Sequence, residues 1–217
     1  MIRLLLALAV LSAVWTAPAA AQLSSGISGQ SSAPVQGVPK DYWIMIRKLG
    51  LCTADRKPEL SHAFLATEPG TSKEKAAFDA LFPKRGNMCM GRYASGTLLI
   101  AHFRGSLAEA FVQMADDEHR AAVLAGPLPA PETIGSLKQF AQCYLAARPS
   151  ESWVLLRDTK VGFGEELEAM RELAPGFAEC LPSDREVSLS PVAIRMSLAE
   201  AMYQALNAPT LAVGKSD

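Results

Sequence analysis

The feature that most constrains how this chain folds is a repeat, which appears when the sequence is shifted by 91 residues against itself. Between positions 52 and 113 the shift gives 14 identities in 62 positions, where ordinary residue usage would give roughly 4 by chance. The identities include the pairs Cys52/Cys143, Cys89/Cys180 and Arg104/Arg195 and the run Ser-Leu-Ala-Glu-Ala at 106–110 and 197–201. We interpret the pattern as an internal duplication.

The N-terminus has the pattern of a secretory signal peptide. Arg3 supplies a positive charge, residues 4–14 form an apolar run, and residues 19–21 form an Ala-x-Ala cleavage site. An uncleaved anchor is the alternative reading, but the apolar stretch is barely long enough to span a bilayer. We expect cleavage near Ala21, a periplasmic or secreted location, and no transmembrane segment in the mature chain.

The four cysteines predict two disulfides, because an exported chain with an even number of cysteines usually pairs them. A four-cysteine zinc site would bring its ligands in close CxxC pairs, and no two cysteines of this chain are that close. Four cysteines allow three pairings. An ancestral single unit could pair only within itself, so we expect Cys52–Cys89 and Cys143–Cys180.

The expected fold class is all-α, with two tandem copies of a disulfide-stapled four-helix unit. Strand signals are weak, since the chain has no sustained alternation of polar and apolar residues. The expected segments are a signal peptide (1–21), a flexible linker (22–40), helical repeat 1 (41–116), a Pro-rich linker (117–131), helical repeat 2 (132–207) and a flexible tail (208–217).

Apolar spacing and helix start signals place the first three helices of each copy. The first helix is expected at 41–56, where apolar residues recur three and four positions apart, and its counterpart starts near Leu137. Pro58 and Pro149 are expected in the first turn of the second helix of each copy. The third helix is expected to begin at a capping box formed by Thr71 and Glu74. The second copy keeps the glutamate of this box as Glu165 but has Gly162 at the cap position.

The fourth helix has the clearest apolar stripe in each copy. The stripes are Leu99, Phe103, Leu107, Ala110 and Met114 in the first copy and Ile194, Leu198, Ala201 and Ala205 in the second. Ser190 and Pro191 mark the start of the second of these helices. Ala108 and Ala199 are small enough to let helices approach closely, so one hypothesis is that the two fourth helices pack on each other. Burial of each alanine inside its own copy is the alternative.

Motifs for catalysis and for cofactor binding are absent from the sequence, which has no H-E-x-x-H, G-x-S-x-G or P-loop pattern. The 91-residue shift aligns the three histidines, His62, His102 and His119, with Trp153, Ala193 and Thr210, so no histidine is repeated. His119 ends the run at 116–119, whose residue types suit a divalent cation but more often form a solvated helix end. We therefore expect no cofactor, no metal and no catalytic residue.

Arg104 and Arg195 are the most interesting polar residues of the repeat. Two related guanidinium groups would suit a carboxylate or phosphate ligand, so both arginines are candidate binding residues. The structural alternative, which repetition in both copies favours, is an arginine that binds carbonyl groups or a carboxylate within its own copy. Glu109 and Glu200 lie about 140° around the helix from these arginines, so we expect both to be solvated.

The charge balance gives no sign of a polyanionic partner. The formal net charge is −1, and the mature part carries 20 basic and 22 acidic residues. A nucleic-acid-binding protein would show a basic surface, so we expect no nucleic-acid partner. The partner or ligand itself is not predicted by the sequence.

The leader, the cysteine of the first helix, the P-x-x-S that follows it, the second cysteine and the run R-x-S-L-A-E-A together resemble small exported proteins of alphaproteobacteria. The resemblance covers 41–207 in two copies and depends chiefly on Cys52, Cys89 and Arg104 with their counterparts. It implies a periplasmic or secreted location. It implies no activity, ligand or site residue.

These observations favour an exported, non-enzymatic helical protein that acts as a binding protein or an envelope accessory protein. One alternative is a protein that binds a small ligand or a lipid in a cavity between helices. Another is an enzyme whose site lies between the two copies and uses His62 or His102 with Arg104.

Overall fold

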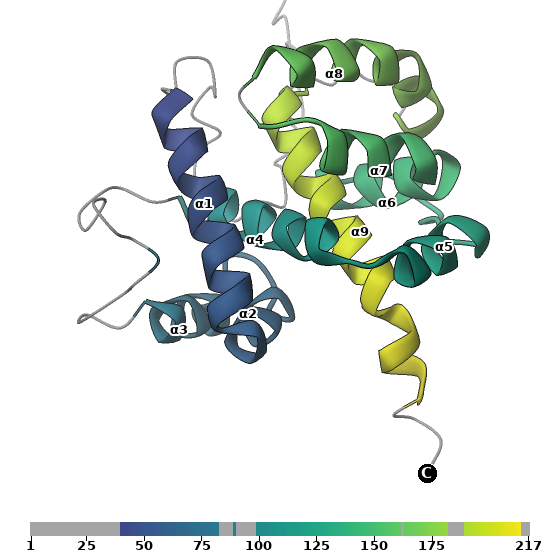
Figure 1. The fold of residues 1–217 in the computed structure, drawn as a ribbon. Helices are drawn as coiled ribbons and strands as arrows, with labels where there is room; N and C mark the ends of the chain where they lie inside the picture. Colours follow the sequence, from purple (N-terminus) through teal and green to yellow (C-terminus); the bar gives the residue numbers. More distant parts are fainter. Residues whose placement is uncertain (1–39, 83–88, 90–98, 162, 182–188, 214–217) are drawn as a thin grey trace, which may run out of the picture.

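The structure is a computed structural model that describes residues 40–82, 89, 99–161, 163–181 and 189–213. Within these ranges the chain forms helices and no strand, so the all-α class is confirmed (Figure 1). The signal peptide, the N-terminal linker up to residue 39 and the last four residues of the tail lie outside the described residues. The helices are α1 (Lys40–Arg56), α2 (Pro58–Leu65), α3 (Ser72–Leu81), α4 (Ile100–Met114), α5 (Asp117–Ala125), α6 (Leu137–Ala147), α7 (Pro149–Asp158), α8 (Gly164–Phe177), the 3-10 segment η1 (Ala178–Cys180) and α9 (Pro191–Val213).

The start signals in the sequence act as expected. Pro58 and Pro149 open α2 and α7, where the missing N–H of proline costs no helical hydrogen bond. Pro191 opens α9. The hydroxyl of Thr71 accepts the backbone N–H of Glu74 at 3.2 Å, which caps the start of α3.

Two segments are more helical than the sequence analysis expected. The first nine residues of the expected Pro-rich linker form α5, because the Asp116 carboxylate accepts the backbone N–H of His119 at 2.8 Å and caps the helix. Val123 is the buried residue that attaches α5 to the core. The expected tail is also helical at its start, since α9 continues to Val213.

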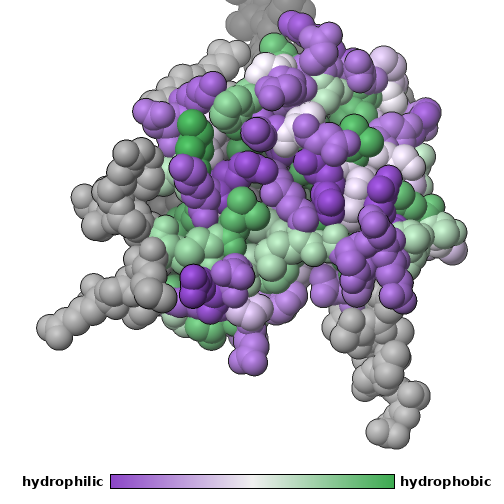
Figure 2. Space-filling view, viewed as in Figure 1, coloured by the Kyte–Doolittle hydropathy of each residue, from purple (hydrophilic) through white to green (hydrophobic). Residues whose placement is uncertain are grey.

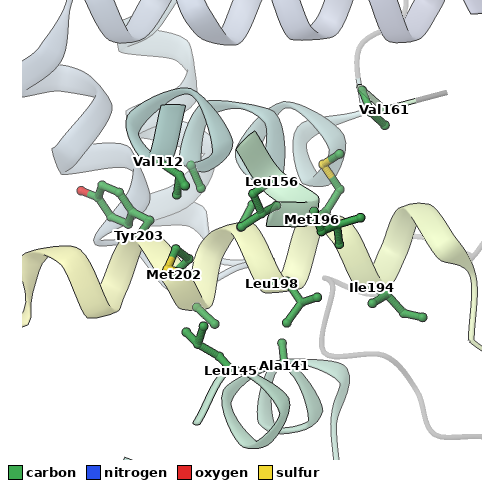
Figure 3. Packing of buried hydrophobic residues seen from close by; sticks show 14 of the residues in the cluster. Val112, Ala141, Leu145, Leu156, Val161, Ile194, Met196, Leu198, Met202 and Tyr203 are labelled. Atoms are coloured by element: carbon green, nitrogen blue, oxygen red, sulfur yellow. The ribbon is translucent and has the colours of Figure 1, made fainter. Parts of the chain in front are cut away.

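The core is centred on α4 and α9, which pack on each other, as one hypothesis from the sequence had it. Helix α1 packs on α4, and α6 packs on α9, so the three main helix–helix contacts form the series α1–α4–α9–α6 (Figure 1). Leu198 of α9 points toward Ala141 and Leu145 of α6, while Val112 and Leu156 lie on the other side of α9 (Figure 3).

The apolar stripe predicted for α4 is wrong at both of its ends. Phe103, Leu107 and Ala110 are buried, but Leu99 is 38% exposed and Met114 is 51% exposed. Leu99 precedes the first turn as the N-cap residue, and Met114 is the last residue of the helix. Both therefore lie past the neighbouring helices that cover the middle of the stripe.

The approach of α4 to α9 is closest at Gly105. A Cβ atom built at Gly105 would lie 2.5 Å from the Cβ of Met196, which is nearer than real Cβ atoms come. Ala108 and Ala199 are both fully buried, and Ala108 lies one turn beyond Gly105 on the same side of α4. Small residues on α4 therefore set the distance between the two central helices.

Two disulfides join Cys52 to Cys89 and Cys143 to Cys180, which are the pairs expected from the sequence. Each closes a loop with a sequence separation of 37 residues. A loop of that length corresponds to about 4 kcal/mol of stabilisation in the chain-entropy model. One bridge joins the C-terminal part of α1 to the segment that precedes α4, and the other joins the middle of α6 to η1, ahead of α9.

The gapless alignment of the sequence analysis is wrong around α3 and α8. Glu74 was aligned with Glu165, but Glu165 is exposed, and the buried carboxylate at the same turn of α8 is Glu166. Helix α7 has ten residues where α2 has eight, and the segment after α7 is one residue shorter than the one after α2, so α8 begins one position later than the alignment places it. The capping device is not kept either, because the N-cap of α8 is Phe163, whose side chain makes no capping bond.

Replacing Gly105 by alanine tests the close approach of α4 and α9. We expect G105A to lower the free energy of unfolding by about 1–3 kcal/mol, because the new methyl group must displace Met196 in a packed core. Urea unfolding would measure the change. Gly164 is the matched control, since a Cβ there meets nothing within 4 Å. Equal stabilities of G105A and Gly164→Ala would contradict the packing described above.

Candidate functional site

Two ion pairs cross between α4 and α9. Arg104 of α4 donates from Nε to Glu200 of α9 at 2.8 Å. Arg195 of α9 donates to Glu109 of α4 from Nε at 2.9 Å and from Nη2 at 2.8 Å. Each arginine thus binds the carboxylate that stands five positions after the other arginine, and the two pairs are related by the same 91-residue shift.

The ion pair between Arg195 and Glu109 is enclosed by protein. We refer to this pair, together with Arg47 and Gln113, as the sealed site. The side chains of Arg195 and Glu109 are 0% and 2% exposed. The amide of Gln113 donates to Glu109 at 2.8 Å and Arg47 donates to Gln113 at 3.1 Å. Because Arg47 Nε also lies 4.0 Å from the carboxylate, Glu109 has two cations and three hydrogen bonds around it.

The ion pair between Arg104 and Glu200 faces a cavity of about 250 Å³. We refer to this pair, together with Lys138 and Gln204, as the open site. Glu200 is 24% exposed and accepts a single hydrogen bond, from Arg104, within the described residues. Lys138, at the position of Arg47, points to Glu68 at 3.9 Å instead. The cavity is lined by Glu68, Pro69, Glu74, Ala101, Arg104, Ser136, Lys138, Ser197, Glu200, Ala201 and Gln204.

Two residues that line the cavity are smaller than the residues aligned with them by the 91-residue shift. The shift pairs Ala101 with Val192, and Val192 is buried at the start of α9. It also pairs Ser136 with Met45, which has a longer side chain.

Arg104 has no N–H group left for a ligand. Its Nη2 donates to the carbonyl oxygens of Leu65 at 2.6 Å and Thr67 at 2.9 Å. Its Nη1 donates to the carbonyl of Phe64 at 3.2 Å and lies 3.4 Å from the carboxylate of Glu74. With Nε on Glu200, all parts of the guanidinium group are bound to protein acceptors.

Burial raises the pKa of Glu200 above its ordinary value, and the attraction of Arg104 only partly opposes this shift. The charge of Glu74, on the other side of Arg104, adds to the rise of this pKa. The ionised carboxylate of Glu200 is therefore held at a cost that its single hydrogen bond does not offset. A buried charge of this kind is a feature of ligand sites.

These contacts revise two expectations about the repeated polar residues. Arg195 was a candidate binding residue, but its side chain is fully enclosed and bound, so an anion has no access to it. Arg104 lines a cavity but has no free donor. Both arginines bind carbonyl groups and carboxylates of the protein itself, as the structural alternative expected. The shortest ion pair of each arginine, however, is with a glutamate of the other helical repeat rather than of its own.

The prediction that Glu109 and Glu200 are solvated is wrong. That prediction considered only partners on the same helix, and the actual partners lie 86 and 96 positions away in the sequence. A signal for these residues was present in the sequence, since both glutamates belong to the repeated run Ser-Leu-Ala-Glu-Ala.

The histidines lie outside the open site. His62 shares a hydrogen bond of 2.5 Å with the hydroxyl of Tyr203 and stacks on Phe111. His102 shares one of 3.0 Å with the hydroxyl of Tyr42, and burial lowers the pKa of His102. Neither histidine lines the cavity with Arg104.

The run at 116–119 forms a helix cap. His119 is exposed, and its hydrogen bond with the Asp116 carboxylate raises the pKa of the histidine. Among the residues that the structure describes, no three histidine, cysteine or acidic side chains are grouped so that they could hold a metal ion.

Exposed apolar side chains do not define a second site. On the face drawn in Figure 2, hydrophilic residues cover most of the upper part, and hydrophobic residues gather in a narrow band below the centre. The large exposed hydrophobic residues are spread over α2, both ends of α4, α7 and α8: Leu60, Leu99, Met114, Val154 and Leu167. No helix in the described part of the chain is both long and apolar enough to cross a bilayer.

Removing the charge of each glutamate should separate the roles of the two sites. We expect Glu109→Gln to lower the free energy of unfolding by about 3–5 kcal/mol, because it removes the carboxylate that accepts two hydrogen bonds from the buried Arg195 and leaves that guanidinium only the ion pair with Glu166 at 3.6 Å. Glu200→Gln should change it by less than about 1 kcal/mol, because the ionised Glu200 gains little from its surroundings. Chemical unfolding at neutral pH measures both values, and equal losses would contradict the distinction between the sites.

Glu200 should also give the stability a pH dependence of known sign. The folded state holds the Glu200 proton to a higher pH than the unfolded state does. The contribution of Glu200 to stability is therefore present below the ordinary pKa of 4.5 and is lost as the pH rises through its raised folded pKa. The stability difference between the parent and Glu200→Gln, followed over this range, should move in favour of the variant. A difference that is constant with pH would contradict the raised pKa.

Comparison with known proteins adds no relative: no protein-family model, no curated protein and no solved structure matches the chain.

Proposed function

We propose that the protein is an exported, non-enzymatic helical binding protein whose small ligand occupies the open site. The observation that carries this proposal is the difference between the two ion pairs. Arg195 and Glu109 are closed over by protein, whereas Arg104 and Glu200 face a cavity of about 250 Å³. Two sites built from the same residue types thus differ mainly in the space beside the carboxylate.

The size and lining of the cavity favour a small polar molecule over a lipid. Pockets for drug-sized ligands measure about 300–1,000 Å³, so this cavity suits a smaller molecule. Its lining combines charged side chains with the methyl groups of Ala101 and Ala201. An acyl chain would cover Oε1 of Glu200 without giving it a hydrogen bond, which is unfavourable.

The enzyme alternative receives no support from the positions of the histidines. It needed His62 or His102 beside Arg104, and each histidine instead has a tyrosine as its hydrogen-bonding partner. The binding proposal needs only the groups that line the cavity.

The proposed origin of the site is an internal duplication. Three observations support it: the two disulfides have the same sequence separation, α1 packs on α4 as α6 packs on α9, and the two crossed ion pairs use equivalent residues. After the duplication, one copy of the polar site would have become filled and the other would have stayed open for a ligand.

The proposed location is the periplasm or the extracellular space, after cleavage of a signal peptide near Ala21. The leader pattern and the resemblance to exported alphaproteobacterial proteins point there. The two disulfides support it, since disulfides persist in oxidising compartments.

Filling the cavity tests the proposed function. The double variant Ala101→Val, Ser136→Met gives the open site the residues of the sealed site. We expect the parent, purified from an exporting host, to carry a bound small molecule in native mass spectrometry and the double variant to lose it. A matched control is Met45→Ser, which changes the sealed copy and should keep the ligand. A parent without a bound molecule, or a filled variant that retains it, would count against the open site.

A further inference from the structure

The ion pair of the open site leaves an acceptor, the carboxylate of Glu200, rather than a guanidinium donor for a ligand. Every N–H group of Arg104 is bound to protein oxygen atoms. Within the described part of the chain, the second carboxylate oxygen of Glu200, Oε1, has no hydrogen-bond partner. The lining contains the carboxylates of Glu68, Glu74 and Glu200 against two cations, one of which is the fully bound Arg104.

The sealed site shows what the equivalent carboxylate binds when its surroundings are complete. Glu109 accepts from both Nε and Nη2 of Arg195 and from the amide of Gln113. The guanidinium of Arg47 lies beside it, with Nε 4.0 Å from the carboxylate. A second cation and additional donors therefore surround Glu109 in the space that is a cavity beside Glu200.

The missing groups at the open site can be named one by one. Nη2 of Arg104 is turned to backbone carbonyls, so Glu200 has one hydrogen bond from its arginine where Glu109 has two. Gln204, the counterpart of Gln113, is exposed and gives no hydrogen bond to Glu200. Lys138, the counterpart of Arg47, is 50% exposed and lies against Glu68.

We propose that the open site binds a ligand with a protonated amine or guanidinium group, which lies beside Glu200 where the guanidinium of Arg47 lies beside Glu109. This inference rests on the proposed function and adds the chemical class of the ligand. It reverses the anion expected from the two arginines, because their positive charge is already used inside the protein.

The electrostatics of the site agree with this assignment. A cation at Glu200 would lower the energy of an ionised carboxylate that burial destabilises. The methyl groups of Ala101 and Ala201 and the ring of Pro69 suit a short alkyl chain attached to the cation. Lys138 competes weakly for the same place, since its ammonium group is half exposed and free to swing into solvent.

The test uses probes of one shape and different charge. The full chain, produced with its disulfides by an exporting host and labelled on alanine methyl groups, is titrated with butylammonium, 1-butanol and butyrate and followed by NMR. We expect butylammonium to shift the methyl signals of Ala101 and Ala201 in a saturable way, at least about tenfold more tightly than the other two probes, as one charged hydrogen bond would give. Methylguanidinium should act like butylammonium.

Variants separate the charge of the site from its shape. Glu200→Gln should weaken butylammonium binding by about tenfold or more, because the amide keeps the shape and removes the charge. Lys138→Arg keeps the charge and gives the open site the guanidinium of the sealed site, so it should also weaken the binding without removing a buried partner. Arg47→Lys is the matched control in the sealed site and should leave the signals of Ala101 and Ala201 and their response unchanged.

The outcomes distinguish failure of this inference from failure of the proposed function. Tighter binding of butyrate or of butanol at the same methyl groups would overturn the cationic ligand while keeping the open site as a binding site. Equal affinity of the parent, Glu200→Gln and Lys138→Arg for butylammonium would also overturn it. No saturable shift with any probe would overturn both the cationic ligand and the proposed function.

Discussion

The buried ion pair between Arg195 and Glu109 is the interaction on which the rest of the structure depends. A buried charge is tolerated only when a partner and additional hydrogen bonds surround it. Arg195 meets this condition by binding Glu109 on α4 and both the hydroxyl and the carbonyl oxygen of Thr159, just after α7. One side chain thereby joins α9 to α4 and to the end of α7, and it also lies 3.6 Å from the buried carboxylate of Glu166 on α8.

The packing of the central helices and the ion pairs support each other. Gly105 lets α4 approach Met196 of α9 closely. This close approach brings the neighbouring Arg104 within hydrogen-bond distance of Glu200 on α9. Burial of Phe103, Leu107 and Leu198 along the same helices supplies the apolar contact that holds the charged groups in place. The disulfides add stability outside this centre, because they join α1 and α6, the helices that flank α4 and α9, to the segments that lead into the central helices.

Features encoded within one helical turn could be predicted from the sequence, and those that depend on distant partners could not. Pro58, Pro149 and Thr71 mark helix starts because each acts on its own first turn. Helix α5 was missed because it has no apolar stripe and depends on the cap by Asp116. Glu109 was misplaced because its partner, Arg195, comes from the other half of the chain. The disulfide pairing could be predicted only because the sequence repeat restricts which cysteines share a unit.

The difference between the two polar sites also explains how a small helical protein can be stable and still hold an unsatisfied charge. A carboxylate that already accepts three hydrogen bonds and is enclosed by protein, as Glu109 is, has no place for a ligand. A carboxylate prepared for a ligand must lack donors before the ligand arrives, and Glu200 accepts only one hydrogen bond while burial raises its pKa. Both pairs join α4 to α9, but only the sealed pair is enclosed by protein on all sides. The same residue types can then serve cohesion at one end of the α4–α9 contact and recognition at the other.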